Sequence, residues 1–173
     1  MRRVLFLCIG NSCRSQMAEG FARTYGSDVM EAASAGLSPA GIVQPLTKQV
    51  MRAKNINIDD QYPKDLSAID ASGFDLIINM SGAKLPARIP IEVRDWAIED
   101  PIGQSEQVYL AVGEQIEHLV MNLILELRRE SRQGDRSPKR QVRGGLRGGG
   151  KIAPKPSSKR KRGPEGLVPP ETA

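Results

Sequence analysis

The sequence predicts an α/β fold, in which a four-stranded parallel sheet lies at the centre of a single three-layer domain. Short apolar runs alternate with segments whose apolar residues recur at helical spacing. The length of 173 residues suits one domain with a sizeable core. From residue 131 the composition changes to Gly, Pro, Ser, Lys and Arg, which bury too little apolar surface to order a chain. We therefore expect a folded domain at 1–130 and a disordered basic tail at 131–173.

The amino-terminal stretch predicts a strand, a loop and a helix in succession. Residues 4–8 are a continuous apolar run that ends in Cys8. Gly10 and Asn11 follow, and both residue types tolerate the backbone angles of a tight loop. In residues 14–25 the apolar positions recur every three or four residues, which is typical of a helix. The hydrophobic period thus changes at this loop.

The rest of the domain continues the alternation of strands and helices. The expected elements are a strand at 31–36, a helix from Pro45 to near Asn55, a short helix around Leu66 and Ile69, strands at 74–80 and 93–97, and a long helix from Ser105 and Glu106. Such an alternation predicts a parallel sheet covered on both faces, whose ligands bind beyond the carboxyl ends of the strands. We therefore expect Cys8 and the segment after Ala97 to meet at one edge.

Charge is divided unevenly between the two parts of the chain. Residues 131–173 hold 12 of the 25 Lys and Arg residues but 3 of the 20 Asp and Glu residues. The domain is therefore near −4 and the tail near +9, so the tail could contact nucleic acid or an anionic surface. No apolar run approaches the roughly 18 residues of a membrane span, and the first residues lack the core of a signal peptide. Two cysteines do not make a disulfide scaffold, so we expect a cytoplasmic protein without membrane insertion.

The spacing of Cys8 and Arg14 predicts an anion site. The five residues between them can curl the backbone so that its N–H groups point inward, and the following helix adds the positive end of its dipole. Cys8 at the floor would be a thiolate nucleophile, Arg14 would grip two oxygens of the anion, and Ser15 would donate to the sulfur. The alternative is structural: Cys8 would be a buried apolar residue at the end of a core strand, and Arg14 would be a surface charge. The anion-binding residues would be Ile9, Gly10, Asn11, Ser12, Cys13 and Arg14.

A family resemblance becomes visible at these residues. The run CIGNSCRSQMAEG resembles the phosphate-binding loop of the low-molecular-weight protein tyrosine phosphatases, and more closely that of the arsenate reductases that share their fold. The stretches SAG at 34–36 and DWAIEDPIGQS at 95–105 add to the likeness, which covers about residues 1–130. The resemblance implies a flavodoxin-like domain that needs no cofactor or metal, with Asp100, directly before Pro101, as the general acid. Otherwise this Asp-Pro pair is simply a turn.

Two reactions fit this set of residues. The first, which we prefer from the sequence, is hydrolysis of phosphotyrosine-type monoesters of proteins or small molecules through a cysteinyl-phosphate, with Asp100 protonating the leaving oxygen. The alternative is thiol-dependent reduction of arsenate. Ile102 and Gly103 stand where the eukaryotic phosphatases typically carry tyrosines, which weakens the first. The segment after the third strand lacks the further cysteines on which many reductases of this fold rely, which weakens the second.

Several residues have less certain roles at this stage. Cys13 could trap an oxidised Cys8 as a disulfide, or it could simply pack beneath the loop. His118 falls between apolar helical positions and is expected to be structural, and the Asp59-Asp60 pair is expected to be a solvated turn. A third hypothesis is a regulator that binds anions without catalysis and uses its tail for nucleic acid. The intact set of Cys8, Arg14, Ser15 and Asp100 argues against it.

Overall fold

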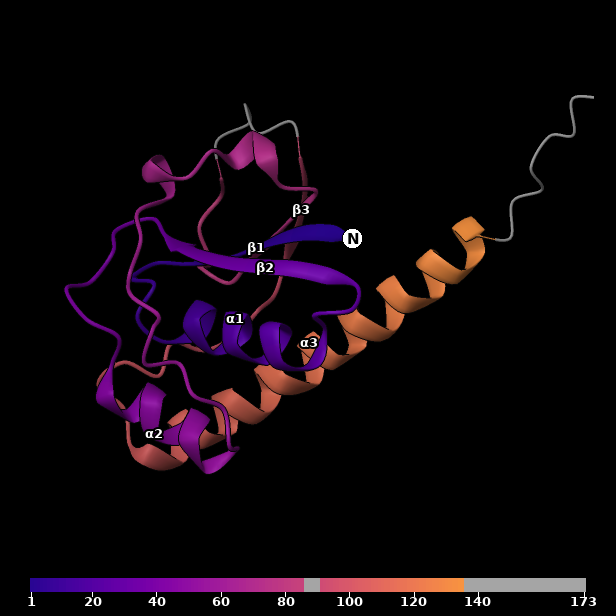
Figure 1. Ribbon diagram of the computed structural model, residues 1–173. Helices are drawn as coiled ribbons and strands as arrows, with labels where there is room; N and C mark the ends of the chain where they lie inside the picture. Colours follow the sequence, from indigo (N-terminus) through magenta and orange to yellow (C-terminus); the bar gives the residue numbers. More distant parts are fainter. Residues whose placement is uncertain (86–90, 136–173) are drawn as a thin grey trace, which may run out of the picture. The chain divides into compact units, whose positions relative to one another are not determined.

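The computed structural model describes residues 1–85 and 91–135. They form an α/β domain whose four parallel strands have the order β2-β1-β3-β4. The strands are β1 (Arg2–Cys8), β2 (Met30–Gly36), β3 (Leu76–Asn79) and β4 (Glu92–Asp95). Figure 1 shows the helices gathered below the sheet and the short turns above it. The predicted three-layer architecture with a four-stranded parallel sheet is confirmed.

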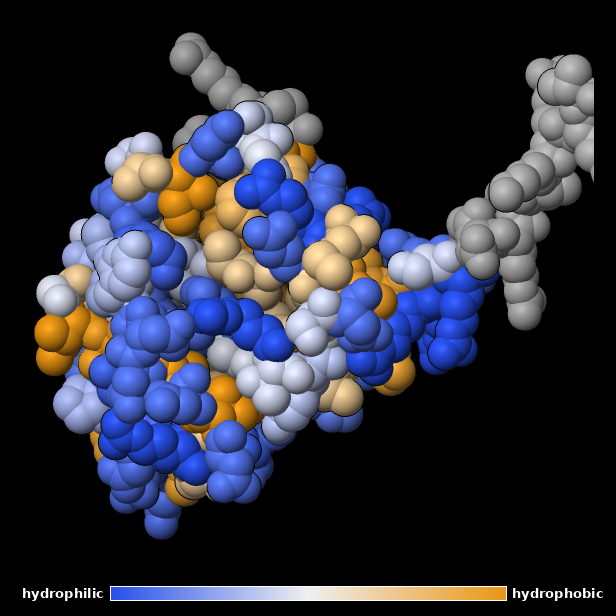
Figure 2. All heavy atoms as spheres, viewed as in Figure 1, coloured by the Kyte–Doolittle hydropathy of each residue, from blue (hydrophilic) through white to orange (hydrophobic). Residues whose placement is uncertain are grey.

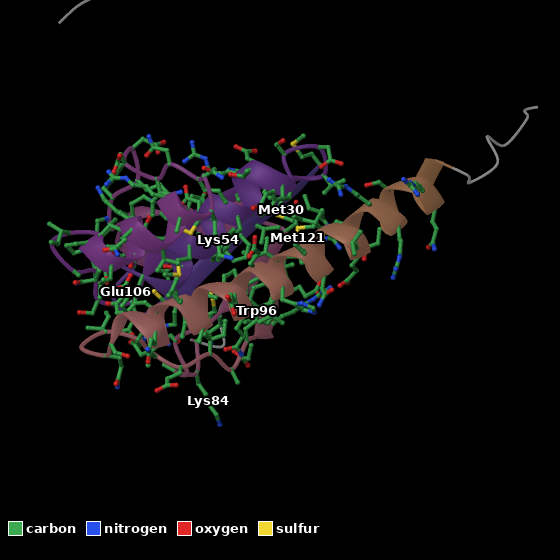
Figure 3. All side chains as sticks on the ribbon, turned by 90° about the horizontal axis from the view of Figure 1, so that it is seen from below. Met30, Lys54, Lys84, Trp96, Glu106 and Met121 are labelled. Carbon is green, nitrogen blue, oxygen red and sulfur yellow. The ribbon has the colours of Figure 1, made fainter. Side chains whose placement is uncertain are left out.

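Three helices cover one face of the sheet. They are α1 (Arg14–Tyr25), α2 (Pro45–Ala53) and α3 (Glu106–Asp135). Helix α1 packs against β1, β2 and α3, so it lies at the centre of the main core. In Figure 3, α3 runs across this helical layer, and Met121 packs against the core. The start and end of α1 agree with the sequence prediction because its apolar residues at 17, 18, 21 and 22 are all fully buried.

The second face of the sheet is covered by short helical turns. The short helix predicted around Leu66 and Ile69 is the 3-10 turn η1 (Leu66–Ala68), and a second turn, η2 (Ala71–Gly73), follows it. Leu66, Ile69 and Phe74 pack against a small core made of Leu5, Leu7, Ala35 and Ile77. Asp65 and Asp70 accept hydrogen bonds from the backbone N–H groups two residues ahead, which favours turns over a longer helix.

Several boundaries differ from those predicted, and the largest differences concern β3, β4 and the end of α3. Strand β3 is shorter than the predicted 74–80, and β4 lies one or two residues before the predicted 93–97. Strand β4 is also an exposed edge, with Val93 at 38% exposure. Helix α3 continues to Asp135, so the prediction that the tail begins at 131 was wrong for its first five residues. Arg, Glu and Gln are good helix formers, and they extend α3 past its last apolar contact. The rest of the predicted tail lies outside the described residues.

Helix α3 is long and apolar enough, by length and composition alone, to cross a membrane over Glu106–Gln133. Its apolar face, however, is the one that closes the core: Val112, Ile116, Val120, Leu123 and Leu127 are buried against the rest of the domain. The helix is therefore amphipathic, as expected for a core helix of a globular domain. Figure 2 shows hydrophilic residues over most of the visible surface, with apolar residues in separate groups.

Candidate active site

The loop between β1 and α1 is held in an open curve by the segment that follows β2. The carbonyl groups of the loop point outward, because each accepts a hydrogen bond from a group behind it. The backbone N–H groups of Leu37, Ser38, Ala40 and Gln44 bind the carbonyls of Cys8, Ile9, Gly10 and Ser12. The Asn11 carbonyl accepts from the Gln16 amide at 2.8 Å. With the carbonyls outside, the N–H groups line the inside of the curve.

Within the described residues, none of the backbone N–H groups of residues 9–13 donates to a protein acceptor. Asn11 has a φ of 45°, the left-handed conformation that asparagine tolerates and that helps successive N–H groups to converge. The Ser12 hydroxyl is buried and has no hydrogen-bond partner among the residues that the structure describes. Buried donors are normally satisfied, so a bound oxyanion would complete these groups. The loop therefore has the form of an anion cradle at the start of α1.

Gly36 is needed for the fit of β2 against this loop. A Cβ at this position would lie 2.7 Å from the Ile9 carbonyl oxygen and 3.0 Å from the Asn11 backbone nitrogen. Both neighbours are backbone atoms of the cradle and cannot move without changing its shape. The SAG stretch thus supplies close packing at the point where the cradle begins.

Cys8 lies at the floor of the cradle and is 3% exposed. Its sulfur is 3.0 Å from the Ser15 hydroxyl. The Asn11 amide nitrogen donates to Ser15 and to Ser34, both at 2.8 Å, and the Ser34 hydroxyl donates to Glu19 at 2.5 Å. The predicted contact between Cys8 and Ser15 is therefore present, and it is the end of a buried polar chain.

Arg14 and Asp100 meet at the rim, where the topology was expected to bring them. The Arg14 guanidinium donates to the carbonyls of Met80 and Ile98 and to the Asp100 carboxylate, which is 2.5 Å away. The arginine side chain is only 6% exposed, whereas that of Asp100 is 43% exposed. Three of the five guanidinium N–H groups are used in the described structure, which leaves an edge with Nε–H and one Nη2–H for an oxyanion.

Glu99, the neighbour that could be mistaken for Asp100, does not contact Arg14 by a hydrogen bond in the described residues. It lines an open cavity of about 400 Å³ beside Arg14, together with Ser81, Gly82 and Trp96. Trp96 packs against the core, with its ring 6.0 Å from that of Phe6, in agreement with the packing role expected for it. Asp100 is thus the carboxylate that the fold brings to the arginine.

Cys13 lies in a different environment from Cys8 although both belong to one loop. It is 2% exposed and packs into the main core. Burial raises the pKa of the Cys13 thiol to about 12. The two cysteines are free thiols in this structure. Cys13 therefore stays protonated and inert at neutral pH unless the loop rearranges.

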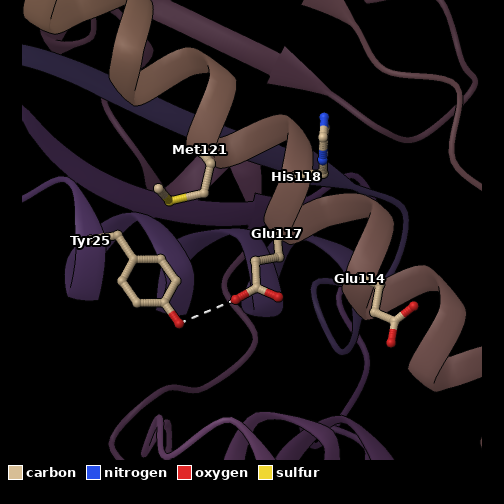
Figure 4. A pocket seen from close by; sticks show the side chains of 5 residues that line it. All are labelled: Tyr25, Glu114, Glu117, His118 and Met121. Atoms are coloured by element: carbon tan, nitrogen blue, oxygen red, sulfur yellow. Dashed lines mark hydrogen bonds between the residues drawn. The ribbon is translucent and has the colours of Figure 1, made fainter.

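The remaining titratable residues singled out in the sequence lie away from the cradle. His118 is exposed on α3 and lines an open pocket of about 370 Å³ with Tyr25, Glu114, Glu117 and Met121 (Figure 4). Asp59 is bound by Arg52 at 2.8 Å and by Lys48 at 3.4 Å, and Asp60 is bound by Arg23. The predicted position of His118 on the surface of the helix is confirmed.

Sequence reasoning missed three residues of the polar chain: Ser34, Glu19 and Lys64. Ser34 was noted only as part of the SAG stretch, and Glu19 only as part of the loop motif. Glu19 lies one helical turn after Ser15 and one before Arg23, on the polar side of α1, so the sequence did not indicate that it is buried. Lys64 carried no signal, because the contact of its backbone N–H with the Asn11 side chain, at 2.7 Å, spans 53 residues.

The chain is similar to known proteins in both sequence and fold. Residues 3–133 match the family described as low molecular weight phosphotyrosine protein phosphatase. The glutaredoxin arsenate reductase of Synechocystis is 37% identical over 127 residues, which are 71% of this chain and 96% of that protein. A solved arsenate reductase in the phosphate-binding state superposes with a TM-score of 0.69 at 37% identity, covering 73% of this chain and 99% of that one. A low molecular weight protein tyrosine phosphatase from T. tengcongensis has a TM-score of 0.65 at 29% identity, with the same two coverages.

Proposed function

The chain belongs to the low molecular weight phosphotyrosine protein phosphatase family, and from this premise we propose that it reduces arsenate with the help of an external thiol. Cys8 is the nucleophile, the residues of the cradle and Arg14 bind the oxyanion, and Asp100 is the proton donor. The sequence alone favoured a phosphatase, whereas the relatives favour the alternative. The observation that carries this choice is the 37% identity to an arsenate reductase over 96% of that protein's length.

The first step uses chemistry that arsenate shares with phosphate. The N–H groups of residues 9–13 and the free edge of Arg14 bind the tetrahedral anion above the sulfur. The Cys8 thiolate attacks arsenic(V), and one hydroxide leaves as water with a proton from Asp100. The product is a Cys8–S–As(V) adduct in which no atom has changed oxidation state.

The second step transfers two electrons and needs another thiol. A thiolate RS⁻ attacks the sulfur of Cys8, the S–As bond breaks, and its electron pair stays on arsenic as arsenite. Cys8 is left in a mixed disulfide with R, and a second RSH releases it as a thiol together with RSSR. The overall reaction converts arsenate and two RSH into arsenite, RSSR and water.

Burial argues for an external source of that thiol. Cys13 is the other cysteine of this chain, and its thiol is buried with a pKa of about 12. The segment after β3 carries Ser81 and Gly82 beside Arg14 where a resolving cysteine could have stood. A small thiol or a thiol protein of the glutaredoxin class, the class that appears in the name of the Synechocystis relative, is therefore the expected reductant.

A phosphatase is the second candidate, and one observation favours it. Hydrolysis of a cysteinyl-phosphate needs a general acid and base at the rim and no reductant. Asp100 is at the rim, bound to Arg14 and partly exposed, while a second accessible thiol is not found among the described residues. The same cradle, nucleophile and acid would then act on a phosphate monoester.

One preparation tests both reactions. The full chain is assayed for arsenite formed from arsenate with glutathione alone or with glutaredoxin, and for hydrolysis of p-nitrophenyl phosphate without thiols. We expect arsenite formation that depends on the thiol, is competitively inhibited by phosphate, and is lost in Cys8→Ser. Rapid hydrolysis that needs Cys8, with no arsenite from any of the thiols, would contradict the proposal and establish the phosphatase instead.

A further inference from the structure

We propose that Glu19 is a positioning residue for the Cys8 thiolate, because it fixes, together with the backbone N–H of Lys64, the direction of the hydrogen bonds in the buried chain that ends at the sulfur. The chain runs from Glu19 through Ser34, Asn11 and Ser15 to Cys8. The inference rests on the proposed role of Cys8 as nucleophile. It concerns how the protein keeps a donor aimed at that sulfur.

The orientation of the Asn11 side chain is fixed first. The backbone N–H of Lys64 lies 2.7 Å from one end of the Asn11 amide. Because a backbone N–H can only donate, this end is the amide oxygen. The amide nitrogen therefore faces Ser15 and Ser34 and gives one hydrogen to each, at 2.8 Å.

Glu19 fixes the next bond. Its carboxylate lies 2.5 Å from the Ser34 hydroxyl and can only accept, so the hydrogen of Ser34 points to Glu19. The oxygen of Ser34 is then an acceptor for Asn11, which agrees with the orientation set by Lys64. Both ends of this segment impose the same direction, so the segment has no alternative arrangement.

The direction at Cys8 follows from these two bonds. The Ser15 oxygen accepts a hydrogen from Asn11, and its own hydrogen needs an acceptor. Among the described residues, Cys8 is the remaining partner of Ser15. Ser15 is therefore the donor and the sulfur the acceptor, which stabilises a thiolate rather than a thiol.

Two cations keep Glu19 in the form that this scheme requires. The carboxylate is 8% exposed, and it lies 3.5 Å from the Arg23 guanidinium and 3.6 Å from the Lys64 ammonium. Arg23 is also bound to Asp60, 3.2 Å away. Two cations beside a carboxylate favour its role as an acceptor, because an ionised carboxylate has no hydrogen to donate. Lys64 thus acts twice, through its backbone on Asn11 and through its side chain on Glu19.

Substitution of Glu19 by glutamine tests the scheme because glutamine keeps the shape and adds a donor. Its amide could donate to Ser34, whose hydrogen would then turn toward Asn11 and meet another donor. The readout is the rate of Cys8 alkylation by iodoacetamide as a function of pH, measured on the full chain without arsenate or phosphate. The charged groups at the rim of the cradle, Arg14 and Asp100, are the same in all variants. We expect the midpoint of the profile to rise by about one pH unit in Glu19→Gln, which is about tenfold slower alkylation below it.

A double-mutant cycle separates this role from general destabilisation. In Ser34→Ala the chain is cut between Glu19 and Asn11, so adding Glu19→Gln should move the midpoint by less than about 0.3 units more. The matched control is Glu117→Gln, which removes a carboxylate that also binds a hydroxyl and a lysine, those of Tyr25 and Lys54, but has no link to Cys8. Its profile should be that of the unaltered chain.

Three results would overturn the inference: an unchanged profile in folded Glu19→Gln, full additivity with Ser34→Ala, or an equal shift in Glu117→Gln. If Glu19→Gln fails to fold, Lys64→Met tests the same step, because it removes a cation beside Glu19 and leaves the backbone contact with Asn11. A shift in the same direction supports the scheme, and no shift overturns it. If the variants show the expected shifts in the alkylation profile but the unaltered protein forms no arsenite, the proposed reaction is refuted while the role of Glu19 stands.

Discussion

The two ends of α1 both carry polar side chains, yet only at one end do their hydrogen bonds converge on a cysteine sulfur. At the amino-terminal end, Ser15 and Glu19 are buried in a chain of hydrogen bonds that ends at Cys8. At the carboxyl-terminal end, the Tyr25 hydroxyl binds Glu117 at 3.2 Å beside an open pocket (Figure 4). Lys54 binds the same carboxylate at 2.6 Å.

The difference lies in burial and in direction rather than in residue types. Both clusters contain a hydroxyl, a carboxylate and a lysine. In the first, each donor has one possible acceptor, so the geometry is unique. In the second, the side chains of Glu117 and Lys54 are 27% and 23% exposed. Water can therefore replace either partner in their ion pair at a low cost in free energy. A polar pocket is therefore not by itself evidence of a functional site in this molecule.

The largest effect is predicted for the two cysteines of the loop that precedes α1, which should differ in their rates of alkylation. Iodoacetamide at pH 7 should label Cys8 at least about 10³ times faster than Cys13. Burial raises the pKa of Cys13 to about 12, three units above its ordinary value, so its thiolate fraction is about a thousandfold lower. Peptide mass spectrometry of the folded chain measures both rates. The rate of Cys13 labelling should still increase with pH above pH 9, without reaching a plateau there.

Comparable labelling of the two cysteines at pH 7 would contradict the structure and would revive Cys13 as an internal resolving thiol. The same sample tests the redox hypothesis for Cys13. If Cys13 protects an oxidised Cys8 as a disulfide, Cys13→Ala should lose recovery of activity after peroxide treatment. Recovery equal to that of the unaltered chain would leave Cys13 a packing residue.

The next effect concerns Asp100, whose predicted role depends on proton transfer. Asp100→Asn should lower the rate of the chemical step by about 10²- to 10⁴-fold, because the amide keeps the shape but cannot supply a proton. Single-turnover arsenite formation measures it. Glu99→Gln is the matched control, and it should change this rate by less than about threefold. Equal losses in the two variants would remove Asp100 from the mechanism.

The sequence predicted the strand, loop and helix of the site because their information is local. The apolar period, Gly10, Asn11 and the Cys8–Arg14 spacing all lie within one stretch, and α1 has the predicted bounds. It could not predict the link from Ser34 to Asn11, which depends on the register of β1 with β2. It misplaced β4 because an exposed edge strand lacks the apolar pattern of a buried one.

A smaller effect is expected from a methyl group placed against the cradle. Gly36→Ala puts a Cβ within 3.0 Å of two backbone atoms of the loop, so the loop must shift. We expect a loss of about 1–3 kcal/mol in the free energy of unfolding and weaker binding of phosphate. Thermal unfolding and calorimetric titration measure the two. Gly41→Ala is the control, since a Cβ there meets nothing within 4 Å, and a loss of phosphate binding in that variant would contradict the packing argument.

The smallest effect is predicted at the carboxyl-terminal end of α1. Burial and the Glu117 carboxylate both raise the pKa of Tyr25. Glu117→Gln removes the carboxylate's part of this effect, together with the charge that faces Lys54, so the tyrosine should ionise at lower pH in the variant. The sign follows because a nearby carboxylate opposes formation of the phenolate. The free energy of unfolding should fall by less than about 1 kcal/mol, since the pair is partly exposed, and arsenite formation should not change. Denaturant unfolding and ultraviolet titration of tyrosine test this. A loss of activity would mean that the two ends of α1 are coupled, and the contrast between them would then describe geometry but not function.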